Sequence, residues 1–252
     1  MRTITELVET FDRAFPFADA LHYDNVGLIV GRKDEKVEKI LLALDVTSSV
    51  IKEAKALGAT LIVSHHPVVF REIKRITDET YTGSILLELI ENKIAAIALH
   101  TNFDRAEEGN NRLLALSLGA KAYEVIEDGF ATEFDLEKEE DMSAFTARVK
   151  EALGESAIRT IGTGAVKKVI ASCGAGISEE LIMRAARTGA VIVTADVKHN
   201  YAEMAKDLGV RLVEPTHYAS EWAFAKQIRK FLAENAADVA CFISRHNTNP
   251  YG

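Results

Sequence analysis

A seven-residue pattern occurs twice in the chain and constrains the fold more than any other feature of the sequence. The first copy spans residues 57–63 (LGATLIV), and the second spans residues 188–194 (TGAVIVT), 131 positions later. In both copies a glycine that ends a helix precedes a short apolar, β-branched run typical of a buried strand. The repetition predicts an α/β protein with two similar halves, each a mainly parallel sheet flanked by helices.

The remaining patterns extend these two copies. Residues 39–67 predict a strand–helix–strand unit, and a third strand is expected over residues 94–99. In the second half, strands are expected over residues 168–172, 191–193, 210–213 and 239–244. We expect an N-terminal half over residues 1–122 and a C-terminal half over residues 165–252. Residues 123–164 are expected to connect them, with an exposed strand and helix of their own and a solvated acidic loop at 137–141.

Composition excludes several classes of protein. The net charge is -8, which argues against a broad nucleic-acid surface, because such a surface needs a basic face. Two distant cysteines without a CxxC motif argue against a disulfide framework and favour a reducing compartment. We expect a cytoplasmic protein, because no signal-like segment and no apolar run long enough to span a membrane are present.

Two adjacent histidines follow the strand of the first copy. Pro67 disfavours helical geometry at His66, so His65 and His66 are expected on an extended tip. Neighbouring side chains of an extended segment point in opposite directions, so the pair suits two metals side by side better than one. The alternative is a polar strand end with two solvated histidines.

Histidines and carboxylates gather directly after four of the predicted strands. These clusters are His65 with His66, His100 with Asp104, Asp196 with His199, and His217 with Glu221. The carboxyl ends of parallel strands lie at one edge of a sheet, where ligand sites of open α/β folds form. Only two of the seven histidines, His22 and His246, fall outside these clusters, which indicates one shared site. The alternative for His217 and Glu221 alone is a surface polar pair.

Two further segments allow two interpretations each. Asp24-Asn25 fits a plain turn, and it also fits a group that orients a ligand. The Gly174-Ala175-Gly176 turn could suggest a phosphate loop. It lacks both the GxGxxG and the Walker spacing, so a plain strand-to-helix turn is favoured.

These motifs resemble the GTP cyclohydrolase I type 2 homologue family, also called Nif-three-like dinuclear metal centre proteins. The resemblance covers nearly the whole chain. It is carried by the segments 24–28 (DNVGL), 64–67 (SHHP), 100–104 (HTNFD), 174–176 (GAG), 194–199 and 217–221 (HYASE). The segment 123–164 is too short for the domain that longer members insert, so the chain resembles the compact form.

The resemblance implies two divalent metal ions per chain, held in the cleft between the two halves. The ligands carried over from the motifs are His65, His66, Asp104, His217 and Glu221, with Glu221 as the bridging carboxylate. His100 and His199 match positions near the pocket that are not core metal ligands, and they are expected as catalytic proton carriers or phosphate-binding groups. Imidazole and carboxylate ligands suit zinc, iron, manganese or nickel. Family members form ring-shaped hexamers, so a homohexamer is expected.

Three functions fit this reading. The first is a metal-dependent hydrolase that acts on a nucleotide-like or phosphorylated small molecule. The second is a non-enzymatic metal carrier or insertion protein. The third, a ring that binds nucleic acid, is disfavoured by the net charge.

Overall fold

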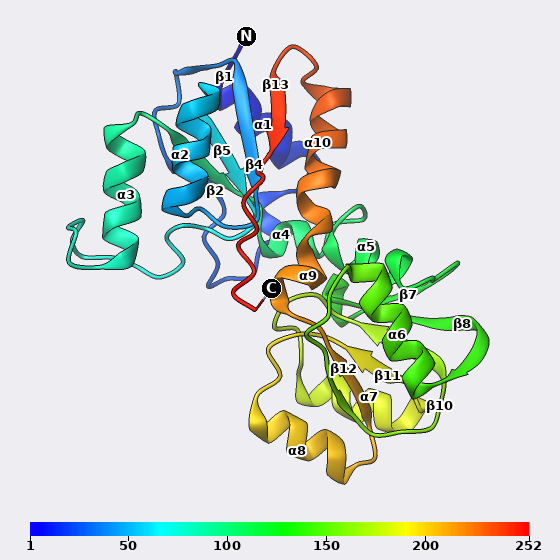
Figure 1. Cartoon of the computed structure of the whole chain (residues 1–252). Coiled ribbons are helices and arrows are strands. Elements are labelled where there is room, and N and C mark those ends of the chain that lie inside the picture. Colours follow the sequence, from blue (N-terminus) through cyan, green and yellow to red (C-terminus); the bar gives the residue numbers. More distant parts are fainter. Residues whose placement is uncertain (252) are drawn as a thin grey trace. The chain divides into compact units, whose positions relative to one another are not determined.

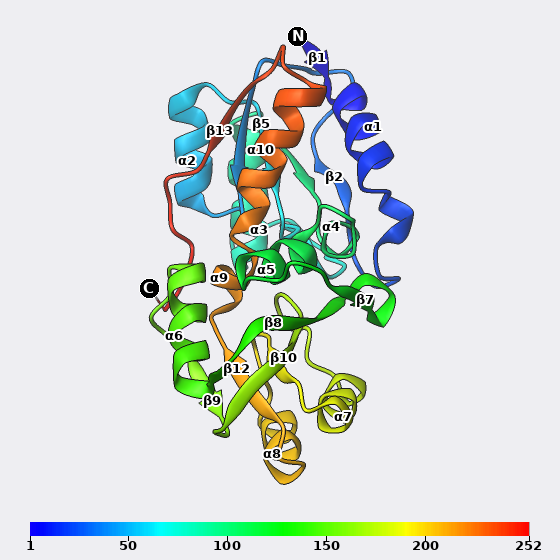
Figure 2. The ribbon, with the colours of Figure 1, turned by 90° about the vertical axis from the view of Figure 1, so that its right-hand side faces the viewer.

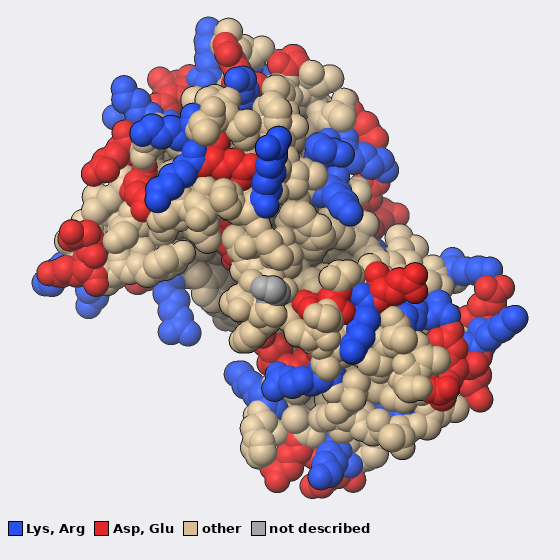
Figure 3. Space-filling model, viewed as in Figure 1, with Lys and Arg blue, Asp and Glu red and all other residues tan. Residues whose placement is uncertain are grey.

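The structure, a computed structural model that describes residues 1–251, contains two compact units. Unit 1 comprises residues 1–103 and 224–248, and unit 2 comprises residues 104–223 with the residues from 249 onward. On the face shown in Figure 3, acidic and basic side chains are interspersed over each unit. Within residues 1–251, no helix has the length and apolarity needed to cross a membrane.

Unit 1 is built on a five-stranded sheet with the order β13-β4-β5-β6-β2. The strands are β2 (Gly27–Val30), β4 (Lys39–Ala43), β5 (Leu61–Ser64), β6 (Ala95–Ala98) and β13 (Ala240–Ile243). All neighbours are parallel except β2, which runs antiparallel to β6. Two short strands, β1 (Arg2–Thr3) and β3 (Lys36–Val37), pair separately. The predicted mainly parallel sheet is therefore found in this unit.

Helices cover both faces of the unit 1 sheet (Figures 1 and 2). On one face lie α2 (Ser48–Leu57) and α3 (Tyr81–Glu91), whose apolar side chains pack on buried β4 and β5 residues such as Leu41 and Ile62. On the other face lie α1 (Ile4–Ala14) and α10 (Ala223–Asn235), whose rings Phe11 and Phe231 stack 5.9 Å apart. A capping box between Thr3 and Glu6 begins α1, as the sequence spacing predicts.

Unit 2 is built on a six-stranded mixed sheet with the order β7-β8-β10-β11-β12-β9. The strands are β7 (Glu124–Ile126), β8 (Ala131–Asp141), β9 (Arg159–Ile161), β10 (Ala165–Ala171), β11 (Val191–Val193) and β12 (Arg211–Glu214). The central strands β10, β11 and β12 are parallel, whereas β7, β8 and β9 join their neighbours antiparallel. The prediction of a mainly parallel sheet is therefore wrong for this unit.

Helices also cover both faces of the unit 2 sheet. One face is packed by α7 (Glu179–Thr188) and α8 (His199–Asp207), and the other by α5 (Asn110–Ser117) and α6 (Met142–Leu153). The short helix α9 (His217–Glu221) follows β12. The two copies of the repeated pattern join α2 to β5 in unit 1 and α7 to β11 in unit 2, within the similar units β4-α2-β5 and β10-α7-β11. Each helix ends at a left-handed glycine, Gly58 or Gly189, so the α/β repeat is confirmed.

The division of the chain differs from the predicted division at 122 and 164. The last strand, β13, pairs in parallel with β4, so residues 224–248 belong to unit 1. The segment 123–164 is an integral part of unit 2, because β8 pairs with β10 and β9 pairs with β12. The acidic residues 137–141 lie within β8 and do not form a loop. Fully buried side chains such as Phe145 and Val149 fix α6 on this sheet.

Candidate metal centre

The strand β5 ends at Ser64, and the backbone bends at both His65 and His66. The two imidazole rings lie 5.0 Å apart, with an angle of 46° between their planes. The predicted extended tip is therefore wrong, and the bend brings the two rings together. His65 is fully buried, whereas the side chain of His66 is 26% exposed.

His65 is held in place by the backbone and by two aromatic rings. Its Nδ1 lies 2.8 Å from the carbonyl oxygen of Leu99, and a carbonyl can only accept, so Nδ1 donates the proton. The ring packs 5.2 Å from Phe224 and 6.4 Å from Phe103. The tautomer with the proton on Nδ1 leaves the lone pair on Nε2, which is the form of histidine that binds metals.

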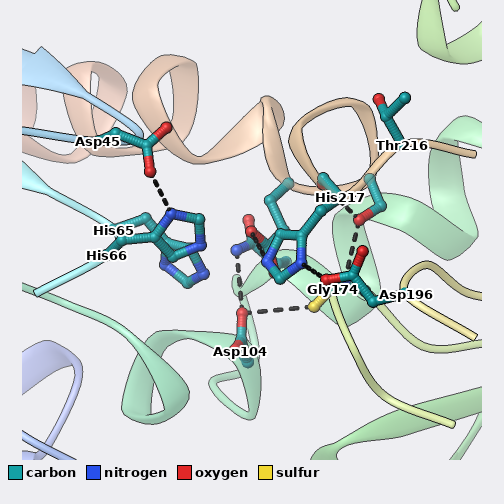
Figure 4. Close-up of polar contacts among 12 residues, drawn as sticks. Asp45, His65, His66, Asp104, Gly174, Asp196, Thr216 and His217 are labelled. Carbon is teal, nitrogen blue, oxygen red and sulfur yellow. Dashed lines mark hydrogen bonds and ion pairs between the residues drawn. The ribbon is translucent and has the colours of Figure 1, made fainter. Parts of the chain in front are cut away.

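His66 is oriented by a chain of polar side chains that includes the C-terminal tail. Its Nδ1 lies 2.7 Å from Asp45 Oδ1 (Figure 4). The second oxygen of Asp45 accepts from Thr248 Oγ1 at 2.5 Å. A histidine held by a carboxylate in this way keeps its ring orientation and presents Nε2 as a more basic ligand. Asp45 can take this role because Thr47 caps the following helix, α2.

His100 is held in the same way by the loop that contains Asp24. Its Nδ1 lies 2.8 Å from Asp24 Oδ1, and the backbone and hydroxyl of Thr101 donate to Asp24 Oδ2. Burial raises the pKa of Asp24, but the bonds from His100 and Thr101 outweigh burial and lower it to about 2. Asp24 therefore orients a histidine, which agrees with the interpretation of Asp24-Asn25 as a group that orients a ligand.

These three imidazoles form one group that could hold a metal ion. One ligand atom from each of His65, His66 and His100 lies within 4.8 Å of the others. Each ring has its Nδ1 bonded to a protein oxygen, which suits coordination through Nε2. The sequence analysis placed His100 near the predicted ligands but not among them. In the structure, His100 belongs with His65 and His66 to a group that could hold a metal ion.

In unit 2, α9 carries two of the predicted ligands. Thr216 caps this helix by accepting from Ala219 N, and His217 and Glu221 follow one turn apart. His217 Nδ1 lies 2.7 Å from Asp196 Oδ2, and Nε2 lies 3.0 Å from Glu221 Oε2 (Figure 4). Burial lowers the pKa of His217, but the carboxylates of Glu221 and Asp196 outweigh burial and raise it to about 11.

The loop after β10 is shaped to fit against this pair. Gly174 has a left-handed φ of +56°, and a Cβ there would lie 2.3 Å from Glu221 Oε1 and 3.2 Å from His217 Nε2. Its N–H donates to Ser220 Oγ at 2.9 Å. Glycine is therefore required at this position by both conformation and space. The turn at residues 174–176 therefore packs directly against the two predicted ligands.

Asp104 is the third predicted ligand in unit 2, and it is 8% exposed. Its Oδ1 accepts from Asn110 Nδ2 at 2.9 Å and from Cys173 Sγ at 3.3 Å (Figure 4). Its backbone oxygen accepts from Asn111 Nδ2 at 3.0 Å. Burial raises the pKa of Cys173 well above its usual value, and the charges of Asp104 and Glu221 raise it further, so this residue stays a neutral thiol.

The donors of unit 2 also fit a divalent cation. A carboxylate oxygen of Asp104 and one of Glu221 lie within 4.8 Å of each other, and Glu221 is only 2% exposed. Two carboxylates buried this closely repel each other unless a positive charge compensates them. The 3.0 Å between His217 Nε2 and Glu221 Oε2 is a separation that two ligands of one ion, each about 2 Å from it, can take.

His199 belongs neither to the three imidazoles of unit 1 nor to the metal donors of unit 2. It is the first residue of α8 and is exposed to solvent. Among residues 1–251, no candidate metal group contains it. The supporting residues Asp45, Cys173 and Thr248 were missed by the sequence analysis. The one available signal was that Asp45 follows β4 at the sheet edge where the ligand-rich segments also begin.

Comparison with known proteins places this arrangement among known relatives. The sequence profile of a family described as Duf34/NIF3 (NGG1p interacting factor 3) matches residues 2–250. The "GTP cyclohydrolase 1 type 2 homolog" of Clostridium perfringens is 32% identical over 240 residues, covering 91% of both chains. The "GTP cyclohydrolase 1 type 2" of Helicobacter pylori is 29% identical over 237 residues, covering 92% of both chains.

The fold is also similar to solved structures. The crystal structure of a hypothetical protein from Staphylococcus aureus matches with a TM-score of 0.91 and 26% sequence identity. The match covers 99% of this chain and 98% of that one. These matches confirm the resemblance noted from the motifs, and the equal coverage of both chains agrees with the compact form.

Proposed function

Because this chain belongs to the Duf34/NIF3 (NGG1p interacting factor 3) family, we propose that it is a dinuclear metal-dependent hydrolase. Its substrate would be a nucleotide-like or phosphorylated small molecule. The observation that supports the proposal is the chemistry of the two donor sets, which consist of imidazoles and buried carboxylates. Hydrogen bonds to Nδ1 of the imidazoles and to Oδ1 of Asp104 hold these side chains in place. Such donor sets suit zinc, iron, manganese or nickel.

The residues that would hold two divalent ions are those predicted from the motifs. They are His65 and His66 from unit 1, and Asp104, His217 and Glu221 from unit 2, with Glu221 as the shared carboxylate. A bound metal pair supplies a water-derived nucleophile near neutral pH and stabilises negative charge in the transition state. The protein's part is to hold its imidazoles in one tautomer and to hold the carboxylates in position.

His100 and His199 would contribute in different ways. The bond between His100 Nδ1 and Asp24 keeps the imidazole oriented, so its Nε2 can carry a proton to or from a substrate. In a second arrangement, the same Nε2 binds a metal together with His65 and His66, and it then carries no proton. His199 is exposed on α8, so its proposed role is limited to contact with a phosphate or a leaving group.

The test begins with elemental analysis of the purified protein, followed by a hydrolase screen with the metal found. We expect about two metal ions per chain, and turnover of a nucleotide or sugar phosphate that stops on chelation and returns on adding that metal back. A fully metal-loaded protein that turns over no compound, but passes its metal to an acceptor protein, would reject the hydrolase in favour of the metal carrier.

We further propose a closed homohexamer, which rests on the family resemblance. Light scattering at micromolar concentration is expected to give about six times the chain mass of 27.7 kDa. A monomer under the same conditions would remove the hexamer without affecting the proposed ligands.

A further inference from the structure

Two aromatic side chains lie exposed beside the imidazole group of unit 1. Tyr23 is 57% exposed and Phe70 is 42% exposed. Their ring centroids are 6.3 Å apart at an angle of 83°, and the Phe70 ring lies 5.7 Å from the His100 ring at 89°. A row of three rings therefore leads from the candidate metal ligands to the protein surface.

The backbone on which these rings stand is fixed by polar contacts. Asn25 Nδ2 donates to the carbonyl oxygen of Val69 at 2.6 Å, which joins the Tyr23 loop to the Phe70 loop. Asp24, directly after Tyr23, accepts from Thr101 N at 3.1 Å and joins the same loop to α4 (Thr101–Asp104). Exposed apolar surface is unfavourable in water, and here two large rings are held open on well-anchored loops. This arrangement is typical of a surface prepared for a ligand rather than of loose packing.

A basic run follows Phe70 directly. Arg71, Lys74 and Arg75 are all exposed. The same loop carries three exposed acidic residues, Glu72, Asp78 and Glu79. Within the described chain, the side chains of these three basic residues form no hydrogen bond or ion pair. These three cationic side chains are therefore available to pair with an anion.

We propose, on the premise of the hydrolase function above, that this surface selects a nucleotide-like substrate with both a base and a phosphate. Tyr23 and Phe70 bind the planar base, because every nucleobase offers a π-face to an aromatic side chain. Arg71, Lys74 and Arg75 bind the phosphate through charge-assisted hydrogen bonds. Phe70 follows His66 by only four residues, so this surface lies close to the predicted ligands in the chain.

Binding of three probes to the metal-loaded full chain tests the two halves of this surface separately. The probes are GMP, guanosine and ribose 5-phosphate. In F70L, Kd should rise about 5- to 150-fold for GMP and guanosine, the range for losing one base stack, and stay unchanged for ribose 5-phosphate. Y23L should give the same pattern with a smaller loss. In the triple variant R71Q/K74Q/R75Q, Kd should rise about tenfold for GMP and ribose 5-phosphate but not for guanosine.

The matched control is F242L, which replaces a 38% exposed phenylalanine on β13, away from the two loops in sequence. It should leave all three Kd values unchanged. F70L binding both GMP and guanosine within twofold of the wild type would overturn the base site. Unchanged GMP binding in the triple variant would overturn the phosphate site.

Two further results separate this proposal from others. A single-stranded oligonucleotide that binds through Phe70 a hundredfold more tightly than GMP would overturn the nucleotide assignment in favour of nucleic acid. Because the assay measures Kd and not turnover, the expected probe pattern would support the surface even if the hydrolase screen failed. An active hydrolase whose KM for a nucleotide is unchanged in F70L would overturn the surface alone.

Discussion

The two donor sets differ most in charge. Unit 1 offers three imidazoles, and unit 2 offers two carboxylates and one imidazole: His65, His66 and His100 in the first set, and Asp104, His217 and Glu221 in the second. The imidazoles of unit 1 are satisfied without a metal, because each Nδ1 is bonded to an oxygen. The carboxylates of unit 2 are buried anions, and one of them depends on the proton of His217 for compensation.

This difference in charge indicates which of the two donor sets needs a bound metal to be stable. A buried anion that loses its positive partner is strongly destabilising, whereas a neutral imidazole that loses a ligand contact is not. We therefore expect unit 1 to resemble a preformed site and unit 2 to be the part that a metal stabilises.

The largest effect is expected from E221Q. The change keeps the shape of the side chain and removes the only charge proposed to be shared by two cations, which repel each other. Metal content should fall from two ions per chain toward one or none, more severely than in H217A. Elemental analysis measures this, with the exposed α8 variant E203Q as the control. Crystals of E221Q soaked in excess metal that show two fully occupied ions at wild-type separation would contradict the shared role.

The two histidines after β5 should separate metal loss from unfolding. H66A should lose metal with little change in Tm, because its side chain is partly exposed. H65A should lose metal and also about 2–4 kcal/mol of unfolding free energy, because it leaves a cavity beside Phe224. Elemental analysis and urea unfolding measure the two quantities, and H246A serves as the control. Full metal content in both variants would show that neither histidine is a ligand.

The C-terminal tail should influence unit 1 through one hydroxyl group. T248V removes the hydroxyl that donates to Asp45, and Asp45 orients His66. Loss of a hydrogen-bond partner behind a metal ligand typically weakens metal affinity about 10- to 100-fold. We expect about tenfold weaker Co²⁺ binding and an altered visible spectrum, with both restored in T248S. Equal behaviour of T248V and T248S would show that the hydroxyl does not position the ligand.

The last prediction concerns the pH dependence of the metal-free protein. The pKa of Asp24, about 2, lies below its unfolded value near 4, so its stabilisation is present above pH 4 and is lost as pH falls toward 2. The pKa of His217, about 11, lies above its unfolded value near 6.5, so its stabilisation is present below pH 6.5 and is lost as pH rises toward 11.

Acid should therefore weaken unit 1, by about 1–2 kcal/mol, and alkali should weaken unit 2. Hydrogen exchange of amides in each sheet reports the two units separately. D24N should flatten the acid limb in unit 1, and H217Q should flatten the alkaline limb in unit 2. Identical pH profiles in both units would show that the two donor sets do not respond separately.

Local sequence was sufficient for the repeated elements and for most of the candidate ligands. A glycine, a β-branched run and a polar end describe interactions between near neighbours in the chain, so a short window predicts β5 and its two histidines. The spacing of His217 and Glu221 likewise places both on one face of α9, where their side chains meet at 3.0 Å.

Tertiary structure alone decided which strands are neighbours and what holds each ligand. The pairing of Ala240 with Lys39 joins positions 201 residues apart, and it moved the last strand out of the half to which the sequence assigned it. The Nδ1 partners of the histidines are a backbone oxygen of Leu99 and the side chains of Asp45 and Asp24. No local pattern specifies such contacts, because any oxygen that the fold brings within hydrogen-bonding distance satisfies an imidazole N–H equally well.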